Sequence, residues 1–363
     1  MKPTDQVDVR AGVDAALAAH VGRLRGEIAP LGPDAVPLVE ALEVSLAGGK
    51  RLRAAFAYWS WRAHLSAAVD EAGHRTAVRV GAALELYQAA ALVHDDLMDG
   101  SDTRRGRPAS HRAFEATHRG QGWAGDAARF GESAAILLGD LALVAAEREF
   151  RDAVAGAEHG PAAHTVFDVM RTEVSVGQYL DVLGQVTEWG SDPVGDEERA
   201  RHVVRAKSAR YSVEHPLAIG AALAGADVDA RARISRIGLA VGEAFQLRDD
   251  LLGVFGDPAA TGKPAGDDLR EGKRTVLLAR TAARASAAEV RLLRAHLGRR
   301  DLDAAAITEL RDVVERSGAV AEVEALIAEL ADPALAELAA APLAEPARSV
   351  LLELGRAAVR RET

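Results

Sequence analysis

The chain has 363 residues, enough for one large domain or two ordinary ones, and a formal net charge of −10. Hydrophobic residues make up 48% and charged residues 27%, which indicates a globular chain. The acidic balance excludes a general nucleic-acid binder, because binding to phosphate backbones needs a basic surface. The absence of cysteine excludes disulfides and cysteine–zinc sites. With no signal-peptide pattern and no membrane-spanning apolar stretch, we expect a cytoplasmic protein.

The sequence pattern is helical along nearly the whole chain. Alanine, leucine, arginine and glutamate dominate, and alternating β-branched runs are scarce. Short clusters of glycine, proline and aspartate interrupt the pattern without repeats or long linkers. We therefore expect a single all-α domain over residues 1–363, built from antiparallel helices joined by turns. Glycine-containing segments near 119–132 and 256–273 are too long for simple turns and are candidate lids.

The first candidate site residues are a compact cationic group near the N-terminus. Lys50, Arg51 and Arg53 follow two glycines in "GGKRLR". Alone, such a group is typical of a solvated basic turn.

An acidic segment follows a helix that is expected to be mostly buried. The nearly apolar stretch 78–93 leads into Asp95, Asp96 and Asp99, and arginines come directly after them. Carboxylates at i and i+4 lie side by side on a helix, and their repulsion costs stability unless a cation is present. Magnesium accepts one or two carboxylates and completes its coordination with water and phosphate oxygens. For this motif alone, a solvated acidic helix end explains the pattern equally well.

A second predicted helix ends in a similar way, with Asp249 and Asp250. One face of this helix carries small and polar residues, namely Gly238, Gly242, Gln246, Asp249 and Gly253. Each glycine inside a helix costs about 1 kcal/mol relative to alanine, so this face serves either close packing or an open groove.

Two aspartate clusters and several separate cationic groups together predict a metal-bridged site for a polyphosphate. Lys207 and Lys263 add to the cations, although a lone lysine is usually a surface residue. Neither a Walker-type loop nor a kinase signature is present, so a nucleotide is not the expected substrate. The pattern favours a diphosphate with an apolar chain.

The ordered motifs "GGKRLR", "LVHDDLMDGSDTRRGRP", "AILLGD", "VGQYLDV", "KSARYS", "FQLRDD" and "GKPAGDDLREGKRT" resemble those of the trans-isoprenyl diphosphate synthases, the polyprenyl synthetase family. Within that family the chain is most similar to geranylgeranyl diphosphate synthases. The motifs span about 48–275, and a helical C-terminal part follows at about 276–363. The resemblance implies an all-α isoprenoid synthase fold around a central cavity, usually as a homodimer. It also implies head-to-tail condensation of isopentenyl diphosphate with dimethylallyl, geranyl or farnesyl diphosphate.

The resemblance assigns roles to individual residues. Magnesium ions, three per active site with substrates bound, would be held by Asp95, Asp99, Asp249 and Asp250, with Asp96 supporting. The allylic diphosphate would be contacted by Arg104, Lys207 and Lys263, with Ser208 and Gln246 near the reacting end. The diphosphate of isopentenyl diphosphate would be bound by Lys50, Arg53, Gln88 and Arg105. The residues expected to be catalytic are Asp95, Asp96, Asp99, Arg104, Lys207 and Asp249.

The chain departs from the family pattern at three positions. Gly253 stands where many members have a third aspartate, which puts a strong second metal site in doubt. Gln88 replaces a frequent histidine, although glutamine also occurs in the family. Ala54 replaces the usual proline, which concerns the backbone.

Small residues before the first aspartate bear on product length. In the family, bulky aromatics four or five positions before it form a floor that gives short products. Here these positions hold Ala91 and Ala90, and Tyr87 is the next obstruction, about one turn of ~5.4 Å further on. We therefore expect geranylgeranyl diphosphate as the product.

Four alternatives remain open: a farnesyl diphosphate synthase, a longer-chain synthase, a class I terpene cyclase and a non-catalytic synthase subunit. "FQLRDD" and "GGKRLR" argue against a cyclase, which needs no second diphosphate site. The incomplete second aspartate motif keeps the non-catalytic subunit open.

Overall fold

The computed structural model describes residues 4–65, 69–256 and 266–360. The chain divides into two compact units. The first comprises Met1–Val166, Pro216–Arg231 and Leu343–Ala347. The second comprises Phe167–His215, Ala232–Pro342 and Arg348–Thr363. The expectation of a single domain stays a prediction.

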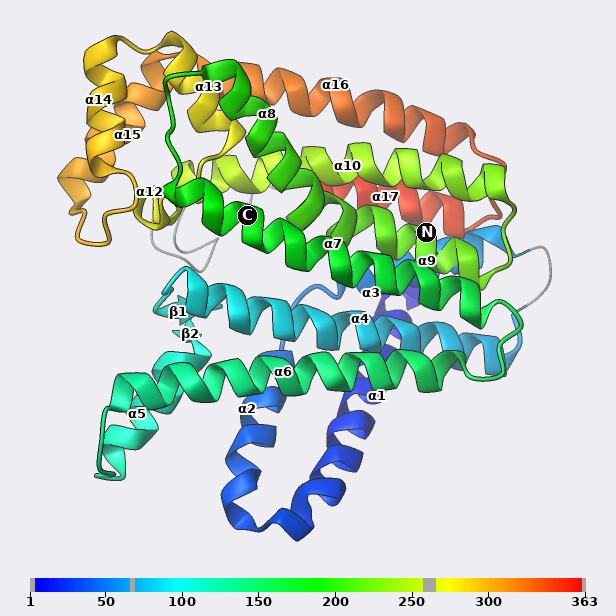
Figure 1. Ribbon diagram of the computed structural model, residues 1–363. Coiled ribbons are helices and arrows are strands. Elements are labelled where there is room, and N and C mark those ends of the chain that lie inside the picture. Colours follow the sequence, from blue (N-terminus) through cyan, green and yellow to red (C-terminus); the bar gives the residue numbers. More distant parts are fainter. Residues whose placement is uncertain (1–3, 66–68, 257–265, 361–363) are drawn as a thin grey trace. The chain divides into compact units, whose positions relative to one another are not determined.

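The described elements are helices except for one small hairpin, so the all-α prediction is confirmed (Figure 1). The elements that begin in the first unit are α1 (Thr4–Ile28), η1 (Ala29–Leu31), η2 (Pro33–Ala35), α2 (Val36–Leu46), α3 (Leu52–His64), α4 (Glu71–Met98), β1 (Thr103–Arg104), β2 (Arg107–Pro108), α5 (Ser110–Gly120), α6 (Ala127–Val154), α7 (Gly160–Val186) and α10 (Val228–Phe255). Both α7 and α10 continue into the second unit.

The elements that begin in the second unit are α8 (Pro193–Val203), η3 (Val204–Glu214), α9 (His215–Leu223), α12 (Asp267–Glu271), α13 (Val276–Arg284), α14 (Ala287–His296), α15 (Ala304–Arg316) and α16 (Ala319–Ala340). From its second residue, α9 belongs to the first unit. The last helix, α17 (Ala347–Val359), lies almost wholly in the second unit. None of the helices in the described ranges is both long and apolar enough to cross a bilayer.

In the first unit, the long helices α4 and α6 lie side by side (Figure 1). Asp70 is the N-cap residue of α4, and its side chain accepts a hydrogen bond from the Gly73 N–H at 2.7 Å. Within 78–93 most residues of α4 are buried among its neighbours, as the apolar run predicted. This packing holds the aspartates at the C-terminal end of α4 in place.

A buried ionic cluster joins α1, α4 and α6 in the same unit. Glu149 of α6 is 1% exposed. Its carboxylate bonds to His20 Nδ1 at 2.7 Å and accepts from Arg23 Nη2 at 2.7 Å and Arg79 Nε at 2.6 Å. Burial alone would raise the pKa of Glu149, but the hydrogen bonds from His20 and Arg79 outweigh it and hold the pKa below its ordinary value. The carboxylate is therefore charged, and it cross-links three helices.

In the second unit, η3 is a π-helix, a rare form that is frequently found at functional sites. Two glycines allow its backbone to lie close to α7 and α10. A Cβ on Gly177 would lie 2.5 Å from the backbone nitrogen of Lys207, and one on Gly242 would lie 2.3 Å from the carbonyl oxygen of Ala209. Of the two roles left open for the glycine-bearing face of α10, close packing is the one observed at Gly242.

The two predicted lid loops have different outcomes. The connection between α5 and α6 covers only residues 121–126, because helix occupies the rest of 119–132. Trp123 packs edge-on against His118 and Phe130, with ring centroids 5.9 and 5.4 Å apart. The prediction of a long loop there is wrong. The loop predicted near 256–273 lies largely outside the described residues, and its last part forms α12.

Candidate active site

The first aspartate cluster lies at the C-terminal end of α4, as predicted. Asp95 and Asp96 are in its last turn, and Asp99 follows the helix with its N–H donating to the Asp95 carbonyl at 2.8 Å. Asp99 is buried and the Asp95 side chain is 17% exposed. Two carboxylates one turn apart offer the oxygen donors that magnesium prefers, so this pair fits the metal.

Asp96 has a different environment from its two neighbours. It is buried, and Arg104 Nε donates to its two carboxylate oxygens at 2.9 and 3.1 Å, with a further contact from Arg104 Nη2. Arg104 Nη2 also lies 3.7 Å from Asp95. The Asp96 carboxylate therefore orients the guanidinium beside the predicted magnesium ligands, which agrees with a supporting role.

The hairpin of β1 and β2 places Arg105 against the glycine turn of "GGKRLR". Arg105 has a φ of 54° at the hairpin tip, and its Nη1 donates to the Ala47 carbonyl at 3.0 Å. A Cβ on Gly49 would lie 3.1 Å from Arg105 Nη2, so a glycine permits this approach. Burial lowers the pKa of Arg105, and the nearby charges of Arg51 and Arg53 lower it further. Motifs far apart in the sequence thus form one cationic group.

A cavity of about 330 Å³ lies at this group. Its lining includes Gly48, Gly49, Asp96, Arg104, Arg105 and Arg107. Three other residues were predicted to bind the diphosphate of isopentenyl diphosphate together with Arg105. These residues, Lys50, Arg53 and Gln88, do not line the cavity, and their roles stay predictions. The cavity has the charge and size for a diphosphate group.

Arg51, by contrast, is a structural residue. It is buried, with Nε donating to Asp14 at 2.8 Å, Nη1 to Glu85 at 3.2 Å and Nη2 to the Leu46 carbonyl at 2.6 Å. These bonds hold the glycine turn against α1 and α4.

The second aspartate cluster lies near the C-terminal end of α10 in the second unit. Gln246 Nε2 donates to Asp250 Oδ1 at 2.8 Å, while Asp249 is only partly buried. Burial raises the pKa of Asp250 to about 8, and the negative charge of Asp268 contributes to the increase. A bound cation would reverse this effect, so this donor set also fits magnesium.

Lys207 is held by an acidic partner that sequence reasoning did not assign. Its Nζ lies 2.6 Å from Asp181 Oδ2, and both side chains are largely buried. Asp181 belongs to the motif "VGQYLDV", which was the available signal. Ser208 follows Lys207 in the π-helix. The predicted ligand Lys263 lies outside the described residues.

Comparisons with known proteins agree with these observations. The family model for polyprenyl synthetase matches residues 36–314. The chain belongs to the polyprenyl synthetase family. One similar solved structure is a geranylgeranyl pyrophosphate synthase from Corynebacterium glutamicum, complexed with isoprenyl diphosphate and magnesium. Its sequence is 37% identical to this chain, and the two structures superpose with a TM-score of 0.91 over 99% of this chain and 100% of that one.

Curated relatives differ in product length. A geranylfarnesyl diphosphate synthase from Aeropyrum pernix is 34% identical over 69% of this chain and 71% of its own length. A nonaprenyl diphosphate synthase from Mycobacterium tuberculosis is 30% identical over 90% of both chains. The predicted family and enzyme class are confirmed, and this protein is a trans-prenyltransferase.

The three residues predicted to set product length in this polyprenyl synthetase differ in how deeply their side chains are buried. Ala90 and Tyr87 are buried in α4, with Ala90 0% exposed. Ala91 is only partly buried and shares its helix face with Gln88 and Asp95. Ala91 is therefore the better candidate for contact with a growing chain.

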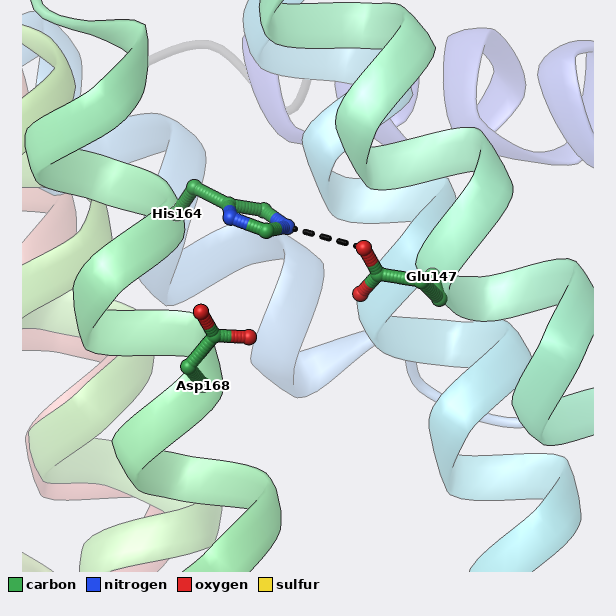
Figure 2. Close-up of side chains that lie close together, drawn as sticks. All are labelled: Glu147, His164 and Asp168. Carbon is green, nitrogen blue, oxygen red and sulfur yellow. Dashed lines mark hydrogen bonds and ion pairs between the residues drawn. The ribbon is translucent and has the colours of Figure 1, made fainter.

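Figure 2 shows a polar cluster whose residues do not belong to the aspartate motifs. Glu147 of α6 and His164 of α7 form a 3.0 Å hydrogen bond, and Asp168 follows one turn later on α7. Asp168 pairs with Arg171 on its own helix. These side chains are metal-ligand types, but their contacts with one another and with arginine account for the arrangement without an ion.

Proposed function

We propose that this enzyme condenses isopentenyl diphosphate head-to-tail with an allylic diphosphate and makes geranylgeranyl diphosphate. The observation that carries the proposal is the cavity where Arg104 and Arg105 meet the glycine turn, lined also by Asp96, with Arg104 Nη2 3.7 Å from Asp95. It combines a cationic pocket with oxygen donors for magnesium. The similarity to a solved synthase that binds isoprenyl diphosphate and magnesium supports this reading.

In the proposed reaction, carboxylates hold the metal and cations hold the diphosphates. Asp95, Asp99, Asp249 and Asp250 would bind magnesium, which neutralises diphosphate charge and makes pyrophosphate a better leaving group. We infer three ions per active site. Arg104 and Lys207 would stabilise the charge that develops as the allylic carbon–oxygen bond breaks. The isopentenyl double bond then forms the new carbon–carbon bond, and the resulting cation loses a proton to the released pyrophosphate. Asp96 and Asp181 would keep Arg104 and Lys207 in place.

One assay tests the proposal. The purified protein is incubated with magnesium, isopentenyl diphosphate and, separately, dimethylallyl, geranyl or farnesyl diphosphate, and the products are identified by mass spectrometry. We expect geranylgeranyl diphosphate. A farnesyl or longer prenyl diphosphate would correct the product, a cyclic hydrocarbon would indicate a cyclase, and no turnover with any starter would overturn the proposal. A cytoplasmic location stays a prediction.

We predict that Ala91→Phe shortens the main product by about one isoprene unit. The aromatic ring would occupy the partly open face of α4 four residues before Asp95, and one unit is roughly one helical turn long. Chromatography of the dephosphorylated products measures the effect. An unchanged product length would show that this face does not limit the chain.

Ala90→Phe serves as the comparison for that variant. Ala90 is 0% exposed, so the ring would overpack the core at a cost of about 1–3 kcal/mol. Thermal unfolding of both variants separates a change in product length from a loss of folded enzyme.

We also infer that the enzyme forms a homodimer through α6. Phe130, Leu137 and Val144 are spaced by seven residues and are 36%, 58% and 66% exposed, which forms an apolar stripe along the helix. Such a stripe on a soluble protein marks an interaction surface, and the seven-residue spacing suits helix packing against a second copy.

The double variant Leu137→Asp/Val144→Asp is expected to weaken dimerisation by more than about tenfold, because it places charges in the centre of the interface. Sedimentation velocity over a concentration series measures this. Val228→Asp, which changes a valine that is 69% exposed in α10, is the control. A monomeric wild-type protein would contradict the inference.

A further inference from the structure

The motif "AILLGD" contains none of the predicted site residues. It lies in the interior of α6, and its glycine, Gly139, is buried. A glycine inside a helix is destabilising relative to alanine, so its presence there indicates that a larger side chain would not fit. The neighbour at Gly139 is the imidazole of His94 on α4, because a Cβ would lie 2.0 Å from its Nε2 and 2.4 Å from its Cδ2. The glycine therefore makes room for the histidine ring.

His94 uses this space to bind α6. Its Nε2 lies 3.1 Å from the carbonyl oxygen of Ile136, three residues before Gly139. A carbonyl oxygen can only accept a hydrogen bond, so Nε2 carries the hydrogen and donates it. The last residue of the motif, Asp140, has its Oδ1 3.7 Å from the same nitrogen, and its negative charge favours a hydrogen there. The motif thus provides a carbonyl, a carboxylate and the space between them for one histidine.

The turn of α4 that contains His94 needs such support. Asp95, Asp96 and Asp99 lie at the C-terminal end of the helix, where the carbonyl groups present a partial negative charge. Carboxylates at that end are unfavourable and repel one another, and the last carbonyls of a helix have no following turn to bind them. Arg104 holds Asp96. His94 ties the same turn to a second helix, α6, which lies beside α4 (Figure 1).

We propose that His94 is a positioning residue for prenyl transfer, which fixes the last turn of α4 against α6 and so directs the carboxylate of Asp95. Successive side chains on a helix differ in direction by about 100°, so His94 can face α6 while Asp95 faces the proposed magnesium ion. His94 acts through the backbone that it shares with Asp95 and does not contact substrate. Gly139 is required because a side chain there would displace the imidazole from the Ile136 carbonyl. This inference deepens the proposed function and rests on it.

Four variants test the pairing of His94 with Gly139. His94→Ala removes the hydrogen bond to α6. His94→Gln is the conservative change, because the side-chain amide can donate to the same carbonyl. Gly139→Ala places a methyl group where the imidazole lies, and the ring, at the end of its side chain, can turn away from it. The double variant Gly139→Ala/His94→Ala combines the two changes.

His164→Ala is the matched control, because His164 also joins a neighbouring helix to α6. Its Nε2 lies 3.0 Å from Glu147 Oε1, and its side chain is 28% exposed, compared with 22% for His94. Each alanine variant loses one hydrogen bond of similar length and exposure, so we expect the two to unfold at similar urea concentrations. A difference in magnesium dependence between them then reflects the place of His94 beside Asp95 and not a general loss of stability.

Two measurements are made on each variant of the full-length enzyme. A rate assay gives the magnesium concentration for half-maximal prenyl transfer, and calorimetry gives the affinity for inorganic pyrophosphate in the presence of magnesium. We expect His94→Ala and Gly139→Ala each to raise that concentration and weaken pyrophosphate binding by about tenfold. The double variant should be no worse than either single variant, because both changes remove the same bond. His94→Gln and His164→Ala should stay close to wild type.

Three results would overturn the inference: wild-type magnesium dependence in His94→Ala, an equal rise in His164→Ala, or a double variant whose loss is the product of the two single losses. If His94→Ala fails to fold, the comparison of Gly139→Ala with His94→Gln decides in the same way. If the wild-type protein makes no prenyl product, the proposed function fails, and the pyrophosphate calorimetry still tests the role of His94.

Discussion

Replacing Asp99 with asparagine is expected to lower kcat/KM for prenyl transfer by about 10³-fold. Asparagine keeps the shape of the side chain and one oxygen but removes the charge that would hold magnesium. Asp99 is 4% exposed and one turn from Asp95 at the end of α4, so the backbone positions its carboxylate. The same change at Asp95 should have a similar effect, because both carboxylates are proposed to hold the same metal–diphosphate group.

Steady-state rates with radiolabelled isopentenyl diphosphate over a range of magnesium concentrations measure this loss. A metal-binding role predicts that high magnesium recovers part of the activity, whereas a role in folding does not. Asp102→Asn is the matched control from the same acidic segment. The Asp102 side chain is 77% exposed and pairs with Arg112 at 2.8 Å, so its loss should change the rate less than about threefold. Equal rates for Asp99→Asn and Asp102→Asn would contradict the assignment.

Much of the first half of the site could be predicted from the sequence because its determinants are local. Helical spacing places Asp95 and Asp99 on one face of α4, and the structure has them one turn apart. The grouping of Arg105 with "GGKRLR" was expected from the resemblance, since no spacing rule connects residues so far apart. In the structure, Arg105 bonds to Ala47 and passes over Gly49.

The residue pattern alone treated the cations of "GGKRLR" as one group, the resemblance assigned only Lys50 and Arg53 to a diphosphate, and the structure shows what Arg51 does instead. Lys50 is exposed, whereas Arg51 is buried and bonds to Asp14, Glu85 and the Leu46 carbonyl. In the sequence, neighbouring arginines and lysines look alike. The burial and the partners of each side chain show whether it can bind a ligand or supports a turn. Local sequence contains no information about that burial.

The pairing of the site residues with their partners was not predicted, although Asp181 stands in the quoted motif "VGQYLDV". The pairing of Lys207 with Asp181 and the placement of Asp268 over Gly253 depend on how separate helices pack. A missing aspartate can be read directly from "DDLLG", but the close approach of Asp268 to Gly253 cannot. The same limitation applies to the segment 119–132, where glycines suggested a long loop and helical packing reduced it to residues 121–126.

Replacing Glu149 with alanine is expected to lower the free energy of unfolding by about 3–5 kcal/mol. The substitution leaves the buried His20 and the partly buried Arg79 without their shared carboxylate partner, and an uncompensated charge in the interior is costly. Glu149→Gln should cost less, because the amide oxygen can still accept one of the hydrogen bonds.

Urea unfolding followed by circular dichroism measures the loss, and Glu132→Ala is the control on the same helix. The Glu132 side chain is 46% exposed and lies 3.5 Å from Arg129, a surface pair whose removal should cost less than about 1 kcal/mol. Glu149 cross-links α1 and α6 to α4, the helix that holds Asp95 and Asp99, so its role is to hold that helix in place and not to contact substrate. Glu149→Ala enzyme that is still folded at low temperature should therefore keep its magnesium dependence. Two results would contradict this structural role. One is a fully folded Glu149→Ala enzyme that needs more magnesium than wild type, and the other is a free energy of unfolding equal to that of Glu132→Ala.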